Sequence, residues 1–296
     1  MSARGAVYLS LAAAIWGGMY AFSSWVLGAG FLGPFTLLTI RLFVSAALLG
    51  VMLLTGGKKS LSLERSEVRE VILIGLVGYV ISLGAQFVGT KLSGSAHGSL
   101  LTSISPAFIV LFARLILGEQ ADGRRLAAVG LATAGAVAIV LPGLAGQSGS
   151  LPGDLMLILA GVSWGLYTVL SKRFSARRGA LAATFWASVV GAVANLPLAA
   201  LEPPPIPASE WPALAWVGLA YICIMSTSVA FYLWNAGFEL MSANTGSLFF
   251  FVQPLVGASL GWALLGETLG SWFFLGAALI GLGILLSALP QRKAAP

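Results

Sequence analysis

The chain has little of what enzymes ordinarily use for catalysis or metal binding. Its 296 residues include one cysteine, Cys223, and one histidine, His97, and only 9% of the residues are charged. A single cysteine excludes an internal disulfide framework and a cysteine-based metal cluster. The sequence also lacks any grouping of His, Cys and carboxylate residues suited to catalysis. We therefore expect no enzyme activity, no metal and no cofactor.

Hydrophobic residues, by contrast, make up 58% of the chain, far more than in a soluble domain. At roughly 20 apolar residues per bilayer crossing, ten segments are long enough to span a membrane. They cover residues 6–27, 34–55, 70–90, 95–117, 124–142, 153–172, 179–200, 211–235, 243–264 and 271–289. The expected fold class is an all-α integral membrane protein with ten transmembrane helices.

The sequence also repeats itself at an offset of 148 residues. Residues 91–120 match residues 239–268 at 8 of 30 positions without a gap, and the same offset carries Trp16 and Gly17 onto Trp164 and Gly165. Two separate matches at one spacing indicate two repeats of about 145 residues. We place them at residues 1–145 and 150–290, with five helices in each.

Positive charge is concentrated between alternate apolar segments. With the N-terminus in the cytoplasm, Lys91 is the only basic residue in the outside loops. This bias predicts that both termini are cytoplasmic. We expect the protein to lie in the inner (plasma) membrane. Because each repeat has an odd number of helices, the second repeat is then inverted relative to the first. Inverted repeats are typical of carriers that open alternately to the two sides of a membrane.

The net charge of +6 does not indicate a nucleic-acid partner, because the basic residues fall in short clusters between apolar runs. The expected partners are the lipid bilayer and a small-molecule solute. We expect the protein to function as a monomer.

These features resemble the drug/metabolite transporter (DMT) superfamily. The resemblance rests on inverted five-helix halves, on Trp-Gly in the first helix of each half, and on the stretch from Pro106 to Glu119 with its counterpart in the second repeat. Within that superfamily the chain resembles the EamA-type exporters, most of all the YddG-type aromatic amino-acid exporters. The resemblance implies export of aromatic or hydrophobic amino acids. Arg41 looks like the family's arginine in helix 2, but its equivalent in the second repeat is Val189.

Polar and aromatic side chains at helical spacing predict a central substrate cavity. The candidates are Trp16, Tyr20, Tyr79, Ser82, Gln86, His97, Ser99, Thr102, Trp164, Tyr167, Ser228, Tyr232, Asn244, Phe250 and Gln253. A second interpretation stays open for the hydroxyls, which also bond to backbone carbonyls and join helices. For Trp16 and Trp164 two interpretations also stay open: the side chains either line the cavity or pack in the hydrophobic core.

Arg41 lies roughly 10 Å into its helix, at 1.5 Å per residue. A charge at that depth is costly unless it is solvated or paired. It either contacts a substrate carboxylate or caps backbone carbonyls at a nearby helix end, and no partner carboxylate is visible in the sequence at its depth.

No aspartate or glutamate lies deep in any predicted helix, which argues against proton antiport and favours a facilitator. Glu119 and Glu267 are expected to cap the helix that follows each, at Gly123 and Ser271.

The alternative within transport is a broader metabolite or drug exporter, with or without proton coupling. An intramembrane serine protease using Ser95 or Ser99 with His97 is disfavoured, because a spacing of two residues points side chains apart on a helix. A channel would differ from a carrier by showing neither saturation nor counterflow.

Overall fold

The computed structural model describes residues 2–56, 62–120, 123–144, 151–257 and 271–288, and all regular structure in these ranges is helical. The first half contains α1 (Ala3–Gly28), α2 (Pro34–Gly56), α3 (Arg65–Gly75), η2 (Leu76–Ser82), α4 (Leu83–Thr102), α5 (Ser105–Leu117) and α6 (Gly123–Leu144). The second half contains α7 (Leu151–Arg178), α8 (Ala180–Ala200), η3 (Ala208–Glu210), α9 (Ala213–Ala220), η4 (Tyr221–Val229), α10 (Ala230–Glu239), α11 (Ala243–Gly246), η5 (Ser247–Phe251) and α13 (Ser271–Ala288).

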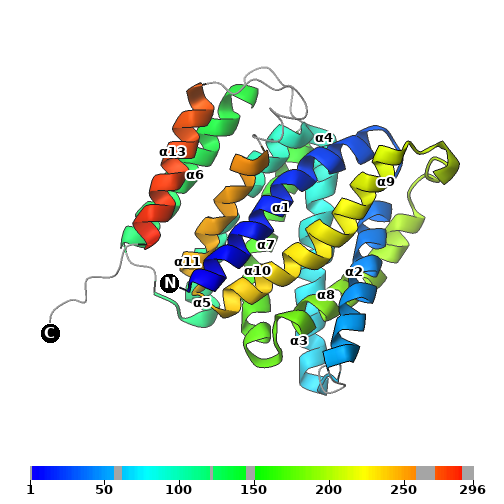
Figure 1. Ribbon diagram of the computed structural model, residues 1–296, viewed down its shortest axis with the longest axis horizontal. Helices are drawn as coiled ribbons and strands as arrows, with labels where there is room; N and C mark the ends of the chain where they lie inside the picture. The colour runs from blue at the N-terminus through cyan, green and yellow to red at the C-terminus, as the bar shows by residue number, and fades with distance from the viewer. Residues whose placement is uncertain (1, 57–61, 121–122, 145–150, 258–270, 289–296) are drawn as a thin grey trace.

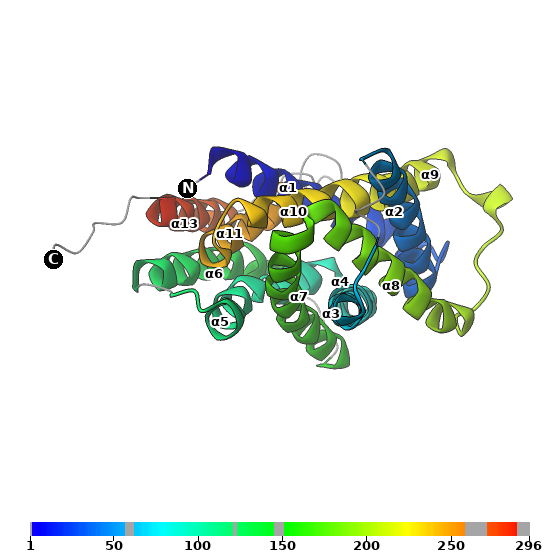
Figure 2. The same ribbon diagram turned by 90° about the horizontal axis from the view of Figure 1, so that it is seen from below.

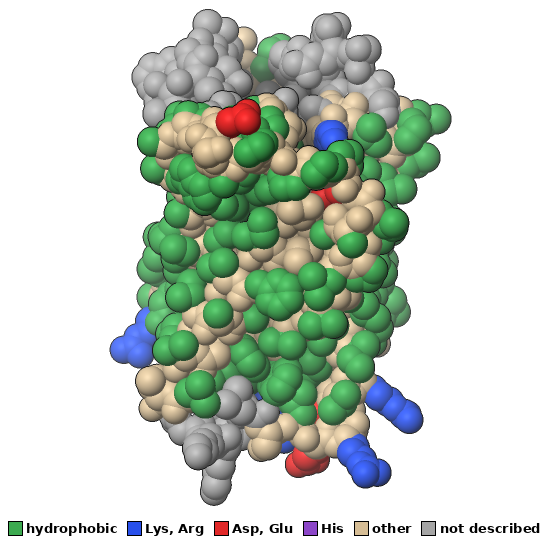
Figure 3. Space-filling view, turned by 90° about the vertical axis from the view of Figure 1, so that its right-hand side faces the viewer, with side chains coloured by type: hydrophobic (Ala, Val, Ile, Leu, Met, Phe, Trp, Pro, Cys, Tyr) green, Lys and Arg blue, Asp and Glu red, His purple; other side chains and the backbone are tan. Residues whose placement is uncertain are grey.

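Long apolar helices dominate this part of the chain. Five of them are long and apolar enough to cross a bilayer, and shorter apolar helices cover Ser105–Leu117 and Phe274–Leu286. The five are Pro34–Thr55, Arg65–Ser93, Leu151–Arg178, Ala180–Ala200 and Ala213–Glu239. Figure 3 shows one face of the molecule, with charged side chains toward its two ends and hydrophobic side chains over the band between them. Such a surface suits lipid rather than water.

Two of these long helices contain a π-helical stretch. One is η2, between α3 and α4, and the other is η4, between α9 and α10. Shifted by 148 positions, the residues of η2 fall on 224–230, which overlaps η4. A π-helix bonds i to i+5 and widens the turn, so side chains beyond it point in directions that the α-helical spacing does not predict.

Helix α4 folds back on itself. Its backbone is helical throughout, including residues 91–94, where the sequence predicted a loop. In a straight helix Thr90 and Gly98 would be about 12 Å apart, yet a Cβ added to Gly98 would lie 2.7 Å from the Thr90 hydroxyl. The chain therefore reverses between these residues. The turn that joins the predicted segments 70–90 and 95–117 is therefore helical.

The prolines of the long repeated stretch follow interruptions in the helix. Residues 103 and 104 separate α4 from α5, just before Pro106, and the 3₁₀ stretch η5 precedes the helical residues 252–257 that contain Pro254. A proline has no N–H and clashes with the carbonyl four residues earlier, which disfavours a continuous α-helix there. Each proline therefore lies just after an interruption of the α-helix.

The helices pack in a consistent set of pairs. Helix α6 packs against α13, α2 against α8, α4 against α7, and α1 against α10 (Figure 1). Figure 2 shows the α6–α13 pair at one end of an elongated cross-section and α2 with α8 toward the other, with α1, α7 and α10 between them. The main hydrophobic core lies in this middle region and includes Trp16, Trp164 and Phe231.

Candidate functional site

A small cavity lies in the middle region, enclosed by helices from both halves of the sequence. Its volume is about 20 Å³, enough for a single water molecule. It is lined by Trp16, Met19, Tyr20, Arg41, Ser82, Leu83, Gln86, Thr102, Ser105, Ala160, Trp164, Phe231, Phe250 and Gln253. The structure therefore brings together eight of the fifteen predicted cavity residues, together with Arg41.

Aromatic rings form one wall of this cavity. The centroids of Trp16 and Trp164 are 5.2 Å apart with an interplanar angle of 88°. Phe231 lies 5.4 Å from Trp16 and 5.6 Å from Trp164, and Phe250 lies 6.3 Å from Trp16. Edge-to-face pairs of this kind contribute about 0.5–1.5 kcal/mol beyond their buried area. The two tryptophans thus line the cavity and also belong to the core.

The two indole N–H groups differ in their partners. Trp16 Nε1 donates to the backbone carbonyl of Ser226 at 2.9 Å. Trp164 Nε1 is buried and has no hydrogen-bond partner among the described residues. Trp16 therefore joins α1 to η4, whereas the N–H group of Trp164 makes no hydrogen bond to a described residue.

The glycine after each tryptophan permits a close helix contact. A Cβ on Gly17 would lie 2.7 Å from the carbonyl oxygen of Gln253 and 2.9 Å from Val256. A Cβ on Gly165 would lie 2.7 Å from Phe108, which precedes Val256 by the repeat offset of 148. Only glycine fits either contact.

Arg41 is fully buried beside the cavity. Its Nε donates to the Thr227 hydroxyl at 2.6 Å and its Nη2 to the Ser226 hydroxyl at 3.3 Å. The guanidinium carbon lies 5.3 Å from the ring centroid of Phe87 and 5.6 Å from that of Phe231, within cation–π range. Nη1 has no partner among the described residues. The observed contacts are therefore hydroxyls and aromatic rings, and they leave one donor of the charged group unused.

Neutral polar groups also line the cavity. Gln86 Nε2 donates to the Tyr20 hydroxyl at 2.9 Å, and that hydroxyl lies 3.1 Å from the Thr102 hydroxyl. Thr102, Ser82 and Ser105 donate to the backbone carbonyls of Gly98, Ala160 and Thr102, respectively. These hydroxyls bond to backbone carbonyls, as the second interpretation expected, and they also line the cavity. Ser82 joins η2 to α7, and the Tyr20–Thr102 contact joins α1 to α4, whereas the carbonyl bonds of Thr102 and Ser105 are local.

Tyr79 and Tyr167 lie just outside the lining, in a buried hydrogen-bond network. Their hydroxyls are 3.1 Å apart. Asn235 donates to Tyr167 at 3.2 Å and to Thr184 at 2.8 Å, and accepts from Ser171 at 2.8 Å. This network fixes η2, α7, α8 and α10 relative to one another, and these elements carry several of the residues that line the cavity.

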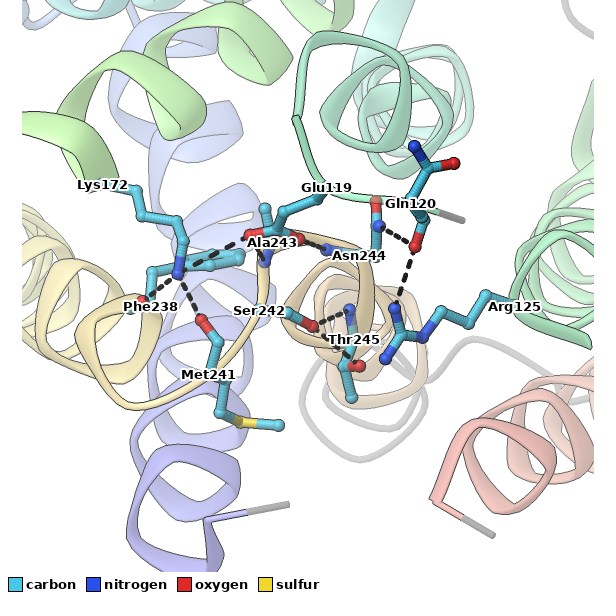
Figure 4. Close-up of polar contacts among 10 residues, drawn as sticks. All are labelled: Glu119, Gln120, Arg125, Lys172, Phe238, Met241, Ser242, Ala243, Asn244 and Thr245. Carbon is cyan, nitrogen blue, oxygen red and sulfur yellow. Dashed lines mark hydrogen bonds and ion pairs between the residues drawn. The ribbon is translucent and has the colours of Figure 1, made fainter. Parts of the chain in front are cut away.

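Other predicted residues lie elsewhere. Ser228 donates to the carbonyl of Cys223 at 3.1 Å, and the partly buried Tyr232 does not line the cavity. Asn244 lies in α11, and its side chain donates to the carbonyl of Gln120, just after α5 (Figure 4). The side chains of His97 and Ser99 lie outside the described residues.

The π-helical stretch η4 explains which polar residues of this helix the sequence pattern missed. A spacing of 3 and 4 selected Ser228, but the neighbouring Ser226 and Thr227 are the residues that contact Arg41. The wider turn of η4 rotates these side chains away from their α-helical directions. The three consecutive hydroxyl residues 226–228 were the only feature of the sequence that pointed to a polar contact here. Nothing in the sequence beyond its hydrophobicity distinguished Phe231 as a cavity residue.

A cluster of polar contacts, none of them made by a residue of the cavity lining, joins the segment after α5 to α7 and α11 (Figure 4). The Glu119 carboxylate accepts the backbone N–H groups of Ala243 and Asn244 at 3.0 and 3.2 Å. Lys172 Nζ lies 3.9 Å from that carboxylate and donates to the carbonyls of Phe238 and Met241. Glu119 is therefore a cap, as expected, but of α11 in the other half rather than of the next helix at Gly123. Its counterpart Glu267 lies outside the described residues.

Known proteins resemble this chain along most of its length. The EamA-like transporter family matches it twice, over residues 3–141 and 151–289. YyaM, an uncharacterized transporter of Bacillus subtilis (strain 168), is 26% identical over 88% of this chain and 86% of its own. An uncharacterized transporter of Archaeoglobus fulgidus is 26% identical over 99% of this chain and 100% of its own.

A shorter relative and a solved structure add to this similarity. The putative permease-like protein YdzE of Bacillus subtilis (strain 168) is 56% identical over 25% of this chain and 94% of its own. A solved crystal structure superposes with a TM-score of 0.81 over 97% of each chain at 23% identity, which shows a shared fold.

Proposed function

Because the chain belongs to the EamA-like transporter family and is a multi-pass membrane protein, we propose that it exports small organic solutes by alternating access. The proposed solutes are aromatic or hydrophobic amino acids. The proposed architecture is ten transmembrane helices in two inverted five-helix repeats. The observation that carries the proposal is the aromatic cavity at the junction of the halves, where the equivalent residues Trp16 and Trp164 meet.

The contacts behind these tryptophans support the repeat architecture. Gly17 packs on Val256 and Gly257, while Gly165 packs on Phe108 and Ile109, which are the same positions shifted by 148. The helix pairs show the same relation. Helix α1 packs on α10, and α7, the counterpart of α1, packs on α4, the counterpart of α10. A two-fold relation between halves allows one set of contacts to open while its counterpart closes.

The charge distribution supports the proposed orientation. Lys172, Arg177 and Arg178 lie at one end of α7, where they pair with Glu119, Glu70 and Glu67. The start of α1 reaches the same end, because Gly5 packs against Met241 beside Lys172. We place this basic end in the cytoplasm, in an inner membrane, with both termini on that side.

The size of the cavity supports a carrier cycle with a closed state. A volume of about 20 Å³ does not hold an amino acid, since pockets for small organic ligands typically measure about 300–1,000 Å³. Solute entry therefore requires the halves to separate along the glycine contacts. The aromatic wall suits an apolar side chain, and the hydroxyl and amide wall suits the polar end of the solute.

We propose that transport follows the solute gradient without proton coupling. Among the described residues, the cavity lining contains no aspartate or glutamate to carry a proton. The test is counterflow of labelled phenylalanine in proteoliposomes with equal pH on both sides. Saturable counterflow is expected, and transport seen only with an imposed proton gradient would contradict the proposal.

The same assay tests the cavity and its specificity. We expect three single substitutions to slow counterflow: Gln86→Ala, Tyr79→Ala and Trp164→Ala. Gln86→Ala and Trp164→Ala remove side chains that line the cavity, and Tyr79→Ala breaks the hydrogen-bond network next to it. Unchanged transport in all three would show that the solute binds elsewhere. Competition by unrelated drugs as strong as by amino acids would indicate a broader exporter.

A further inference from the structure

Side chains that line the cavity carry hydrogen-bond donors that the protein itself does not use. Arg41 and Trp164 belong to the lining, and their Nη1 and Nε1 atoms are buried with no partner among the described residues. The amide nitrogen of Gln253 shares these properties. The first two groups donate and never accept, so the solute has to supply the acceptors. A buried donor without a partner raises the free energy of a site, and a bound acceptor removes that penalty.

The charge of the site has one sign. Arg41 is fully buried, and the two groups it binds, Ser226 and Thr227, are neutral hydroxyls. The sequence has ten acidic residues, and none of those that the structure describes lines the cavity. A guanidinium with a free N–H, buried in a membrane protein without a counter-ion, favours an anionic ligand.

An ammonium group would find only neutral partners in the lining, namely hydroxyl and amide oxygens and the faces of the aromatic rings. The oxygens of the lining side chains belong to neutral groups, such as the Ser82 and Thr102 hydroxyls. An ammonium near Arg41 would also be repelled by the positive charge, an effect that is strong where water is excluded. In an amino acid, the carboxylate is thus the group that gains most from this cavity, and the ammonium gains little.

We propose that the cavity recognises its solute by a carboxylate that binds Arg41 and Trp164, and that an ammonium group is not required. The solute class is arylalkyl and large alkyl carboxylates, of which amino acids are one subset. This inference rests on the proposed function of the cavity as the transport site. The carboxylate lies at Arg41, and the apolar part of the solute lies against Trp16 and Phe231.

A binding measurement tests the inference without depending on transport. Cys223 is the only cysteine and is buried, so a thiol-reactive dye reports unfolding of the detergent-solubilised protein. A ligand that binds the native state raises the unfolding temperature. The probes are phenylalanine, 3-phenylpropionate and 2-phenylethylamine, which share a ring and a two-carbon chain and carry both groups, only the carboxylate, or only the ammonium.

We expect 3-phenylpropionate to raise the unfolding temperature at least as much as phenylalanine, and 2-phenylethylamine to leave it unchanged. The inference is overturned by stabilisation with 2-phenylethylamine, by stabilisation with phenylalanine alone, or by no stabilisation with any probe. Binding of 3-phenylpropionate together with a complete lack of phenylalanine counterflow would overturn amino-acid export and leave the carboxylate inference standing.

Variants of Arg41 separate binding from a structural role. Arg41→Met has a similar volume and no charge, and we expect it to weaken 3-phenylpropionate binding by about tenfold to a hundredfold. Because the buried charge has no counter-ion, its removal should leave the unfolding temperature without ligand unchanged or higher. Arg41→Lys should restore part of the binding. A lower unfolding temperature with ligand binding retained would show a purely structural arginine.

Trp164→Phe provides a second variant should Arg41→Met fail to fold. It removes an N–H that has no partner among the described residues, and it keeps a ring in place. We expect at least about tenfold weaker binding of 3-phenylpropionate, the effect of one hydrogen bond to a charged acceptor. Unchanged binding in a folded Trp164→Phe protein would overturn the assignment of this donor.

Discussion

The indole rings of Trp16 and Trp164 meet nearly at right angles, 5.2 Å apart, and the N–H groups of the two rings are used differently. Trp16 donates to the carbonyl of Ser226, and Trp164 has no partner among the described residues. The two residues are equivalent by the 148-residue offset, so nearly the same sequence context has produced a helix-joining side chain in one half and an unpaired donor in the other.

This difference predicts unequal losses for two matched substitutions. Trp16→Phe and Trp164→Phe remove the same ring volume from the core, but only Trp16→Phe also removes a donor to the buried Ser226 carbonyl. Trp16→Phe should therefore lower the free energy of unfolding by about 1 kcal/mol more than Trp164→Phe. Thermal unfolding followed through Cys223 measures both. Equal losses would show that the two N–H groups are equally satisfied.

The glycines behind the tryptophans should not tolerate a methyl group. Gly17→Ala and Gly165→Ala each place a Cβ 2.7 Å from a neighbour, and overpacking of this kind costs about 1–3 kcal/mol. Gly130→Ala is the matched control, because nothing lies within 4 Å of its added Cβ and alanine favours a helix. We expect lower unfolding temperatures for the first two variants and an unchanged or higher one for the control.

The contact of Glu119 with Lys172 should contribute to stability through coupling between the two halves. The pair is separated by 3.9 Å and both side chains are less than one-fifth exposed. A double-mutant cycle with Glu119→Gln and Lys172→Met should give a coupling energy of about 0.5–1 kcal/mol. The more exposed pair of Glu64 and Arg178, 3.6 Å apart, should give less. A coupling near zero at Glu119 would show that its role is limited to capping α11.

Glu202 holds the opposite end of the bundle. Its carboxylate accepts the N–H groups of Phe35 and Thr36, both at 2.8 Å, and the Thr36 hydroxyl at 2.7 Å. It therefore caps α2 from a loop distant in sequence. Glu202→Ala should lower the free energy of unfolding by about 1–2 kcal/mol. Glu210→Ala, at an exposed residue nearby in sequence, is the control and should have little effect.

The helical content and the repeat offset could be predicted from the sequence because both depend on local or periodic patterns. Apolar runs marked the long helices. The position of Glu119 could not be predicted, because the helix it caps begins 124 residues later. The contacts of Arg41 with Ser226 and Thr227 could not be predicted either, since they join distant helices and the π-helical η4 changes the turn.

The sequence by itself determined that this is a helical membrane protein with two related halves, because hydrophobic length and internal repetition are properties of the chain alone. Only the tertiary structure decided which side chains share the cavity. It placed Arg41 against Ser226 and Thr227, 185 and 186 residues away, and left Trp164 without the partner that Trp16 has. The reason is physical: a hydrogen-bond donor finds its partner across helices, and a sequence does not state which helices meet.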